Sequence, residues 1–77
     1  MNGKVEIVLA DVLRMPVDKI RDDLAMTDVE AWDSLKHMEL IVALEQAYAV
    51  ELTFDEIVAM QSVGQIKRVL RERSLLC

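Results

Sequence analysis

The sequence predicts an all-α fold: a four-helix bundle with three main helices, one short helix and a long loop after the first helix. Apolar residues recur every three or four positions in three separate stretches, which is the period of an amphipathic helix. Asp, Ser or Thr precedes each of the last three expected helices and could cap its free N–H groups. Two Gly and one Pro in 77 residues are too few for the turns of a small all-β fold.

The first helix is expected to end near Arg14 or Met15. Pro16 sets this end, because the residue before a proline disfavours the helical conformation. Five apolar residues at helical spacing form its inner face: Val5, Val8, Leu9, Val12 and Leu13.

A connection of about eighteen residues, 16–33, follows the first helix. A loop of this length in a small domain is either pinned to the core or functional. Four apolar residues are candidates for pinning it: Ile20, Leu24, Met26 and Trp32. We expect Trp32 to lie in the core or to cover the loop rather than to hold a ligand.

The second helix is expected to begin at Asp33 or Ser34, either of which can cap it, and to run to about Ala49. One apolar stripe of this helix faces the core: Leu40, Ile41, Leu44 and Tyr48. A second stripe, rotated from the first, consists of Leu35, Met38 and Val42, with Glu39 and Glu45 at its edges. This second stripe either packs under the long loop or serves a partner.

Residues 53–56 (TFDE) and 62–65 (SVGQ) each fit the capping box, in which the first side chain caps the helix and the fourth reaches back. The first box opens a short helix that carries Ile57 and Met60. The second opens the last helix, whose core face holds Val63, Ile66, Val69 and Leu70.

The net charge of −5 is unevenly distributed along the chain. Residues 22–56 hold ten acidic residues and one basic residue, Lys36, whereas the last helix carries Lys67, Arg68, Arg71 and Arg73. A nucleic-acid binder needs a basic surface, so this class is excluded. The acidic segment is either a solvated surface or a surface that steers a basic partner.

Length and composition favour a single domain over residues 1–77 in the cytoplasm. Charged residues interrupt every apolar run before the length of a membrane span, and residues 1–10 lack the pattern of a signal peptide. The single cysteine, Cys77, allows no internal disulfide, and one His with one Cys cannot build a structural zinc site.

Ser34 is the residue most suited to carry chemistry. It stands in the run WDSL (32–35), at a helix N-terminus that favours anions such as a phosphate ester. The alternative is a plain capping serine. His37 lies one turn later, and a Ser–His pair can act as nucleophile and base. Because a third orienting group and a pocket are lacking, we expect a surface histidine rather than a hydrolase.

The run DSL (33–35), followed by MEL (38–40) and LTFDE (52–56), resembles the acyl carrier protein family over nearly the whole chain. The resemblance implies that a transferase with Mg²⁺ attaches 4′-phosphopantetheine from coenzyme A to Ser34. The thiol of that arm would hold acyl or aminoacyl groups as thioesters, so the protein would be a carrier and not an enzyme.

The resemblance also implies partners: the phosphopantetheinyl transferase, a loading enzyme for acyl or aminoacyl groups, and synthases and transferases with basic patches. Asp33, Glu39 and Glu45 would meet the basic patches, and Leu35, Met38 and Val42 would form the apolar centre of the contact. Met60 and Ile57 are further docking candidates that would border this face or an acyl pocket. We expect a monomer.

Three departures from the fatty-acid carriers point to a specialised pathway, polyketide or nonribosomal in type. Lys36 and His37 follow the DSL run, Trp32 precedes it, and the second helix ends in EQA (45–47) where the family more often has glutamates. The alternative function is a small acidic helical adaptor that docks basic partners without a prosthetic group.

Overall fold

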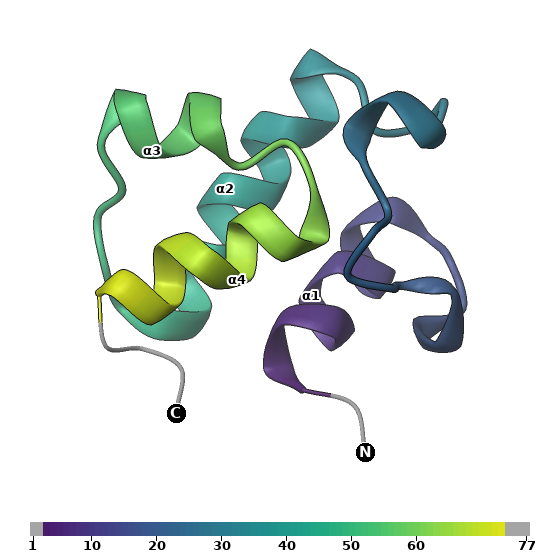
Figure 1. Cartoon of the computed structure of the whole chain (residues 1–77), viewed down its shortest axis with the longest axis horizontal. Coiled ribbons are helices and arrows are strands. Elements are labelled where there is room, and N and C mark those ends of the chain that lie inside the picture. Colours follow the sequence, from purple (N-terminus) through teal and green to yellow (C-terminus); the bar gives the residue numbers. More distant parts are fainter. Residues whose placement is uncertain (1–2, 74–77) are drawn as a thin grey trace.

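The computed structural model describes residues 3–73, and Cys77 lies outside them. Four α-helices follow in order: α1 (Lys4–Leu13), α2 (Ser34–Tyr48), α3 (Phe54–Ala59) and α4 (Val63–Glu72) (Figure 1). The loop between α1 and α2 contains two single-turn 3₁₀ helices, η1 (Val17–Lys19) and η2 (Met26–Asp28). The prediction of three main helices, one short helix and a long first loop is therefore confirmed.

α1 ends one residue before the predicted range. Arg14 adopts a left-handed conformation, with φ 56° and ψ 49°, and the Met15 N–H then donates to the Ala10 carbonyl at 3.0 Å. This bond helps to satisfy a carbonyl near the end of the helix. Pro16 starts the next short turn with an extended backbone.

The core lies where α1, α2 and α4 meet. The buried residues of these helices are Val5, Leu9, Ala10 and Leu13 from α1, Leu40, Ile41 and Leu44 from α2, and Val63, Ile66, Val69 and Leu70 from α4. Tyr48 packs against them while partly buried. α1 packs on α2, and α3 packs on α4 (Figure 1).

The long loop is a fixed part of the fold. Ile20 and Trp32 are buried, and Leu24 and Met26 pack against the core. The loop also bonds by backbone groups to the start of α4: Val63 N–H donates to Leu24 O at 2.9 Å, and Gly64 N–H to Asp22 O at 2.9 Å. All four predicted pins thus contact the core.

Gly64 allows the close approach of α4 to this loop. A Cβ at position 64 would lie 3.1 Å from the Asp22 carbonyl oxygen, which is tighter than ordinary van der Waals contact. The absence of a side chain therefore lets the first turn of α4 donate directly to the loop.

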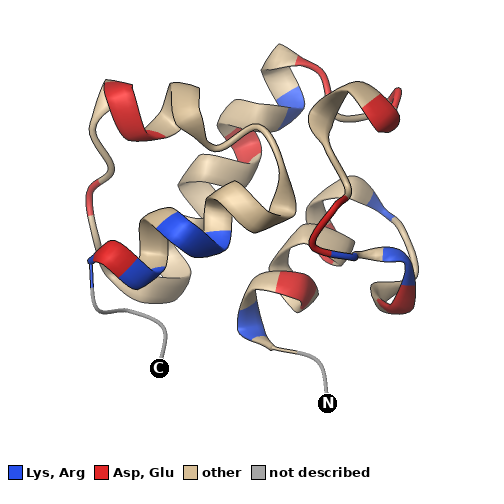
Figure 2. Cartoon of the chain, viewed as in Figure 1, with Lys and Arg blue, Asp and Glu red and all other residues tan. Residues whose placement is uncertain are grey.

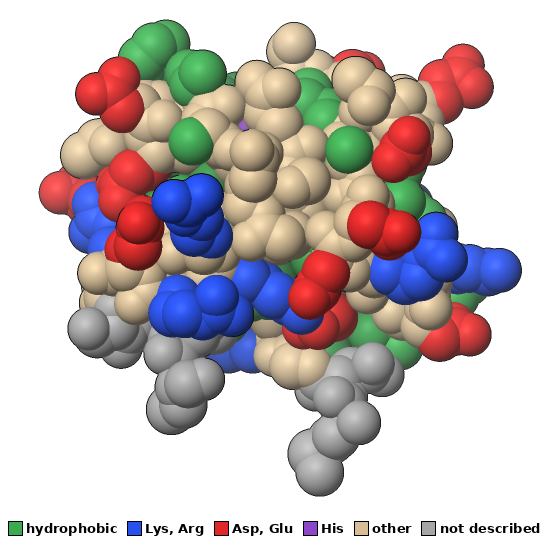
Figure 3. Space-filling model, in the orientation of Figure 1, with side chains coloured by type: hydrophobic (Ala, Val, Ile, Leu, Met, Phe, Trp, Pro, Cys, Tyr) green, Lys and Arg blue, Asp and Glu red, His purple; other side chains and the backbone are tan. Residues whose placement is uncertain are grey.

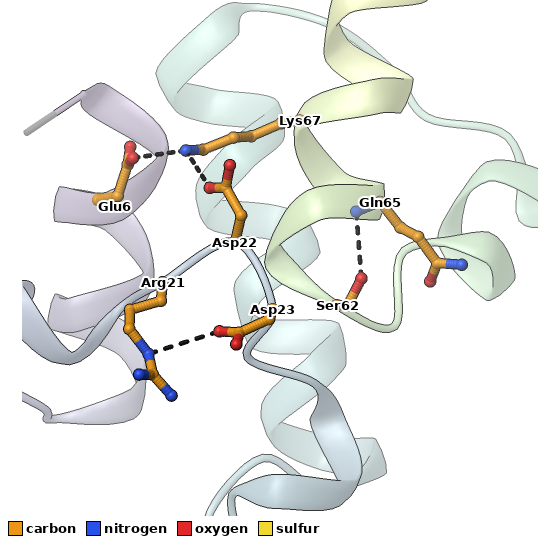
Figure 4. Close-up of polar contacts among 7 residues, drawn as sticks. All are labelled: Glu6, Arg21, Asp22, Asp23, Ser62, Gln65 and Lys67. Atoms are coloured by element: carbon orange, nitrogen blue, oxygen red, sulfur yellow. Dashed lines mark hydrogen bonds and ion pairs between the residues drawn. The ribbon is translucent and has the colours of Figure 1, made fainter.

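Ion pairs join the same elements. Lys67 Nζ lies 2.6 Å from Glu6 Oε2 of α1 and 2.6 Å from Asp22 Oδ1 of the loop (Figure 4). The hydrogen bonds to Asp22 and Glu6 raise the pKa of Lys67. Burial raises the pKa of Glu6, but the hydrogen bond from Lys67 and its backbone bond outweigh burial, so the net pKa of Glu6 is lowered.

Three of the four basic residues assigned to the last helix form ion pairs within the chain. Lys67 holds α1 and the loop, Arg73 pairs with Glu56 of α3, and the exposed Arg68 lies 3.9 Å from Glu72. Figure 2 shows basic residues along α4 with acidic residues close by, and in Figure 3 charges of both signs alternate on this face. The surface of α4 is therefore mixed in charge and not purely basic.

The two predicted capping boxes have different outcomes. At α3, Thr53 Oγ1 accepts from Glu56 N–H at 3.2 Å, and Glu56 Oε1 accepts from Thr53 N–H at 2.9 Å, which confirms the box. At α4, Ser62 Oγ accepts from Gln65 N–H at 3.1 Å, but Gln65 Oε1 accepts from the N–H of Gln61. This second half of the prediction is wrong: the side chain of Gln65 reaches one residue further back, to Gln61 instead of Ser62.

Candidate functional site

Ser34 is the first residue of α2 and is exposed. The capping role belongs to Asp33, whose Oδ1 accepts from the Lys36 N–H at 2.8 Å. The hydroxyl of Ser34 is thus not the cap of its helix. This excludes the alternative that Ser34 is a plain capping serine.

The start of α2 is suited to a negatively charged group. Among residues 3–73 the N–H groups of Ser34 and Leu35 have no hydrogen-bond acceptor, while those of Lys36 and His37 bond to Asp33. A helix of 15 residues places its positive dipole end here. A phosphate ester on the Ser34 oxygen would therefore lie in a favourable field.

His37 is not the surface histidine that the sequence predicted. His37 is 8% exposed, and both of its ring nitrogens lie within hydrogen-bond distance of a partner. Trp32 Nε1 donates to His37 Nδ1 at 3.0 Å, and His37 Nε2 lies 2.9 Å from the carbonyl oxygen of Ile57. The prediction is wrong because the ring turns inward between the loop and α3. A ring held in this way does not serve Ser34 as a general base, which removes the hydrolase interpretation.

The second apolar stripe of α2 faces outward. Leu35 is 72% exposed, Met38 50% and Val42 49%. The alternative, that Met38 and Val42 pack under the long loop, is therefore excluded. Asp33 and Glu39 are exposed beside the stripe, and Glu39 pairs with Lys36 at 3.0 Å. Apolar side chains flanked by carboxylates thus begin directly at Ser34.

Three predicted docking residues have structural roles. Met60 is fully buried, so it is not part of an exposed docking face; that it borders an acyl pocket stays a prediction. Glu45 is half-buried, and its Oε2 accepts from the Leu52 N–H at 2.9 Å. Ile57 is half-buried against the core.

α3 adds two exposed apolar residues that were not predicted as docking residues. Phe54 is 78% exposed and Val58 48%, both on α3. Figure 3 shows hydrophobic side chains gathered at the corner of the molecule that α3 forms. Their spacing of four residues places them on one side of a helix. This spacing was the feature of the sequence that could have predicted a shared apolar surface.

Other classes of site find no support in the described part of the chain. Residues 3–73 contain no cluster of three or more His, Cys, Asp or Glu side chains arranged to bind a metal ion. No described helix is both long enough and apolar enough to cross a membrane.

Comparison with known proteins identifies the family. Residues 4–70 match the model of the family described as "Phosphopantetheine attachment site". The acyl carrier protein of Clostridium acetobutylicum is 31% identical over 68 residues, which cover 88% of each chain. The acyl carrier proteins of Chlamydia trachomatis serovars D and A are each 28% identical over 73 residues, 95% of each chain. The chain therefore belongs to the acyl carrier protein family, whose prosthetic group is 4′-phosphopantetheine.

Proposed function

We propose that Ser34 is the attachment residue for 4′-phosphopantetheine and that the protein carries acyl or aminoacyl intermediates between the enzymes of a biosynthetic pathway. The observation that carries this proposal is the exposed Ser34 hydroxyl at the first position of α2, with the cap supplied by Asp33. The hydroxyl is free for transfer, and the helix end favours the phosphate that results.

The prosthetic group supplies a terminal thiol, which holds the cargo as an activated thioester. The protein supplies attachment, orientation and recognition by partner enzymes. Because the arm is tethered, its cargo reaches a high effective concentration at a docked partner. In this role the protein is a cosubstrate of its partners and not itself an enzyme.

The test uses mass spectrometry. The protein is incubated with coenzyme A, Mg²⁺ and a phosphopantetheinyl transferase of broad specificity. One added phosphopantetheinyl mass is expected in the wild type and in Ser62→Ala, and none in Ser34→Ala. Ser62 is the matched control because it also begins a helix, but its Oγ caps that helix. An unchanged wild-type mass, with a transferase shown to be active on another carrier, would favour the adaptor without a prosthetic group.

The docking surface for these partners is proposed to be the exposed stripe of α2. It consists of Leu35, Met38 and Val42, flanked by the carboxylates of Asp33 and Glu39. An apolar centre with an acidic border complements an apolar patch with a basic border on a partner. Ile57 and Glu45 would contribute at the margin, because each is half-buried.

We further propose a specialised pathway rather than housekeeping fatty-acid synthesis. The supporting observation is that His37, one of the residues that depart from the fatty-acid carriers, is built into the fold through Trp32, which also departs from them. The test compares loading by the malonyl transferase of fatty-acid synthesis on this protein and on a fatty-acid carrier. Loading of both at equal kcat/KM would contradict the specialised assignment.

A further inference from the structure

A hydrogen bond joins the side chains of Trp32 and His37. Trp32 precedes the capping Asp33, and His37 is the fourth residue of α2. Trp32 is 2% exposed, and its indole N–H donates to Nδ1 of His37 at 3.0 Å. The two rings lie 6.1 Å apart between centroids, with their planes tilted by 30°. Ser34 lies between these two residues in the chain and is the exposed residue of the three.

This contact occupies the place of a hydrophobic staple. In a staple, the residue before the N-cap packs on the fourth helical residue and fixes the angle at which the chain enters the helix. Here Trp32 holds the first position and His37 the second, because Asp33 is the cap and Ser34 begins the helix. The staple therefore spans Asp33 and Ser34, so it fixes the backbone that carries the Ser34 side chain.

The second ring nitrogen of His37 extends the staple to α3. An indole N–H can only donate, so His37 Nδ1 is the acceptor and Nε2 carries the proton. That proton is donated to the carbonyl oxygen of Ile57, 2.9 Å away. One neutral ring thus links the loop before Ser34 to α2 and α3.

We propose that His37 is a positioning residue for the modification of Ser34: the staple from Trp32 through His37 to Ile57 holds the Ser34 hydroxyl at one fixed place relative to α2 and α3. This inference rests on the proposed function of Ser34. A docked transferase contacts the exposed stripe of α2, so a fixed entry angle presents the hydroxyl to the transferase in a reactive orientation.

Each ring nitrogen of His37 has one partner: Nδ1 accepts from the indole N–H of Trp32, and Nε2 donates to the carbonyl oxygen of Ile57. Charged residues occur on all the elements that meet at the ring: Asp28 and Glu30 on the loop, Asp33, Lys36 and Glu39 on α2, and Asp55 and Glu56 on α3.

Most of these charges have partners of their own. Asp28 accepts from Ala25 N–H, Asp33 caps Lys36, the Lys36 ammonium pairs with Glu39, and Glu56 pairs with Arg73. Glu30 and Asp55 are exposed. None of the described hydrogen bonds joins any of these side chains to the histidine ring, whose described partners are the indole of Trp32 and the carbonyl of Ile57.

The test separates the two bonds. His37→Asn keeps an acceptor where Nδ1 stands, His37→Gln keeps a donor that can reach Ile57 O, and His37→Phe keeps a ring with neither. Transferase kcat and KM are measured for each, with the fluorescence of Trp32, the single tryptophan, as the signature of the staple. We expect His37→Phe to lower kcat about tenfold or more with KM changed less than about twofold, because misplacement of a reacting group by 1 Å can cost about a hundredfold. His37→Asn should recover most of kcat.

Three outcomes would overturn the inference. The first is wild-type kcat and KM in a folded His37→Phe whose tryptophan emission shows a broken staple. The second is a decrease in kcat that correlates with the decrease in Tm across the three variants and not with the loss of either hydrogen bond. The third applies even if His37→Phe does not fold: kcat of His37→Asn stays about tenfold or more below the wild type although its tryptophan emission shows that the staple is kept. Failure of the wild type to be modified at all would instead remove the proposed function.

Discussion

Arg73 and Glu56 form a two-point ion pair between the end of α4 and the first turn of α3. Arg73 Nε donates to Glu56 Oε2 at 2.7 Å, and Nη2 donates to Oε1 at 2.5 Å. Glu56 Oε1 also accepts from the Thr53 N–H. One carboxylate thus completes the capping box of α3 and binds the end of α4.

This pair predicts a loss of stability in acid. The hydrogen bond from Arg73, aided by the bond from the Thr53 backbone, lowers the pKa of Glu56 from 4.5 to about 2. Because the folded-state pKa is depressed, the contribution of Glu56 is fully present above about pH 5 and is lost as the pH falls from about 4.5 to 2. A partly exposed pair contributes about 1 kcal/mol at most, or a few degrees in Tm.

The measurement is Tm against pH for the wild type and Glu56→Gln. Their difference should be largest near neutral pH and should shrink toward pH 2. Glu72→Gln is the control, since Glu72 is exposed and lies 3.9 Å from Arg68. A difference between wild type and Glu56→Gln that stays constant down to pH 2 would contradict the role of this pair.

Lys67→Met should destabilise the fold, because Lys67 joins α1 and the loop to α4. Its side chain is 19% exposed, and that of its partner Glu6 is 16% exposed. Loss of the ammonium leaves the Glu6 carboxylate without its cation, at a cost of about 1–3 kcal/mol. Urea unfolding measures this change. The matched control is Arg68→Met at a side chain 77% exposed, which should change stability by less than about 0.5 kcal/mol. Equal effects of the two substitutions would show that the Lys67 bridge contributes nothing of its own.

Ala49→Gly should stabilise the protein. Ala49 directly follows α2 with φ 54° and ψ 49°, the left-handed region in which a Cβ is disfavoured. Glycine relieves this strain, and we expect a gain of about 1 kcal/mol. Ala43→Gly, the same change inside α2, should instead cost about 1 kcal/mol. Thermal unfolding of both variants is the measurement, and a loss of stability in both would contradict the strain at Ala49.

Val42→Asp should weaken docking without unfolding the protein. Val42 is 49% exposed on the stripe of α2, whereas its neighbour Ile41 is 2% exposed in the core. We expect a Tm within a few degrees of the wild type and a KM for the transferase raised about fivefold or more, since an apolar contact is replaced by a desolvated charge. Ile41→Asp should abolish cooperative unfolding. If Val42→Asp loses its cooperative transition as well, Val42 belongs to the core rather than to a docking surface.

The acidic border of the stripe predicts that docking depends on salt. Exposed charges are screened beyond about 10 Å at 0.1 M ionic strength. The KM of the transferase should therefore rise as NaCl increases from 0.05 to about 0.5 M, and Glu39→Gln should reduce this rise. A KM that is indifferent to salt would remove electrostatic steering and leave the apolar stripe as the whole contact.

The sequence by itself determined the helices and their inner faces, because both depend on local periodicity, capping and proline. Leu40 and Leu44 were predicted to be buried and are, and the Thr53–Glu56 box forms as its spacing predicts. The proposal for Ser34 also rests on a local motif. The outward stripe of α2 was visible as a pattern, but only the fold excluded its burial under the loop.

Tertiary structure decided which polar and apolar groups meet across the chain. His37 and Met60 are buried because the loop and the turn after α3 close over them, and no local pattern encodes that closure. The acidic segment and the basic last helix are drawn together in space, so that Asp22 and Glu56 are bonded to Lys67 and Arg73 rather than left to a partner. Whether a charge or a methionine is available at the surface depends on which distant segment packs against it, and that is a property of the assembled fold.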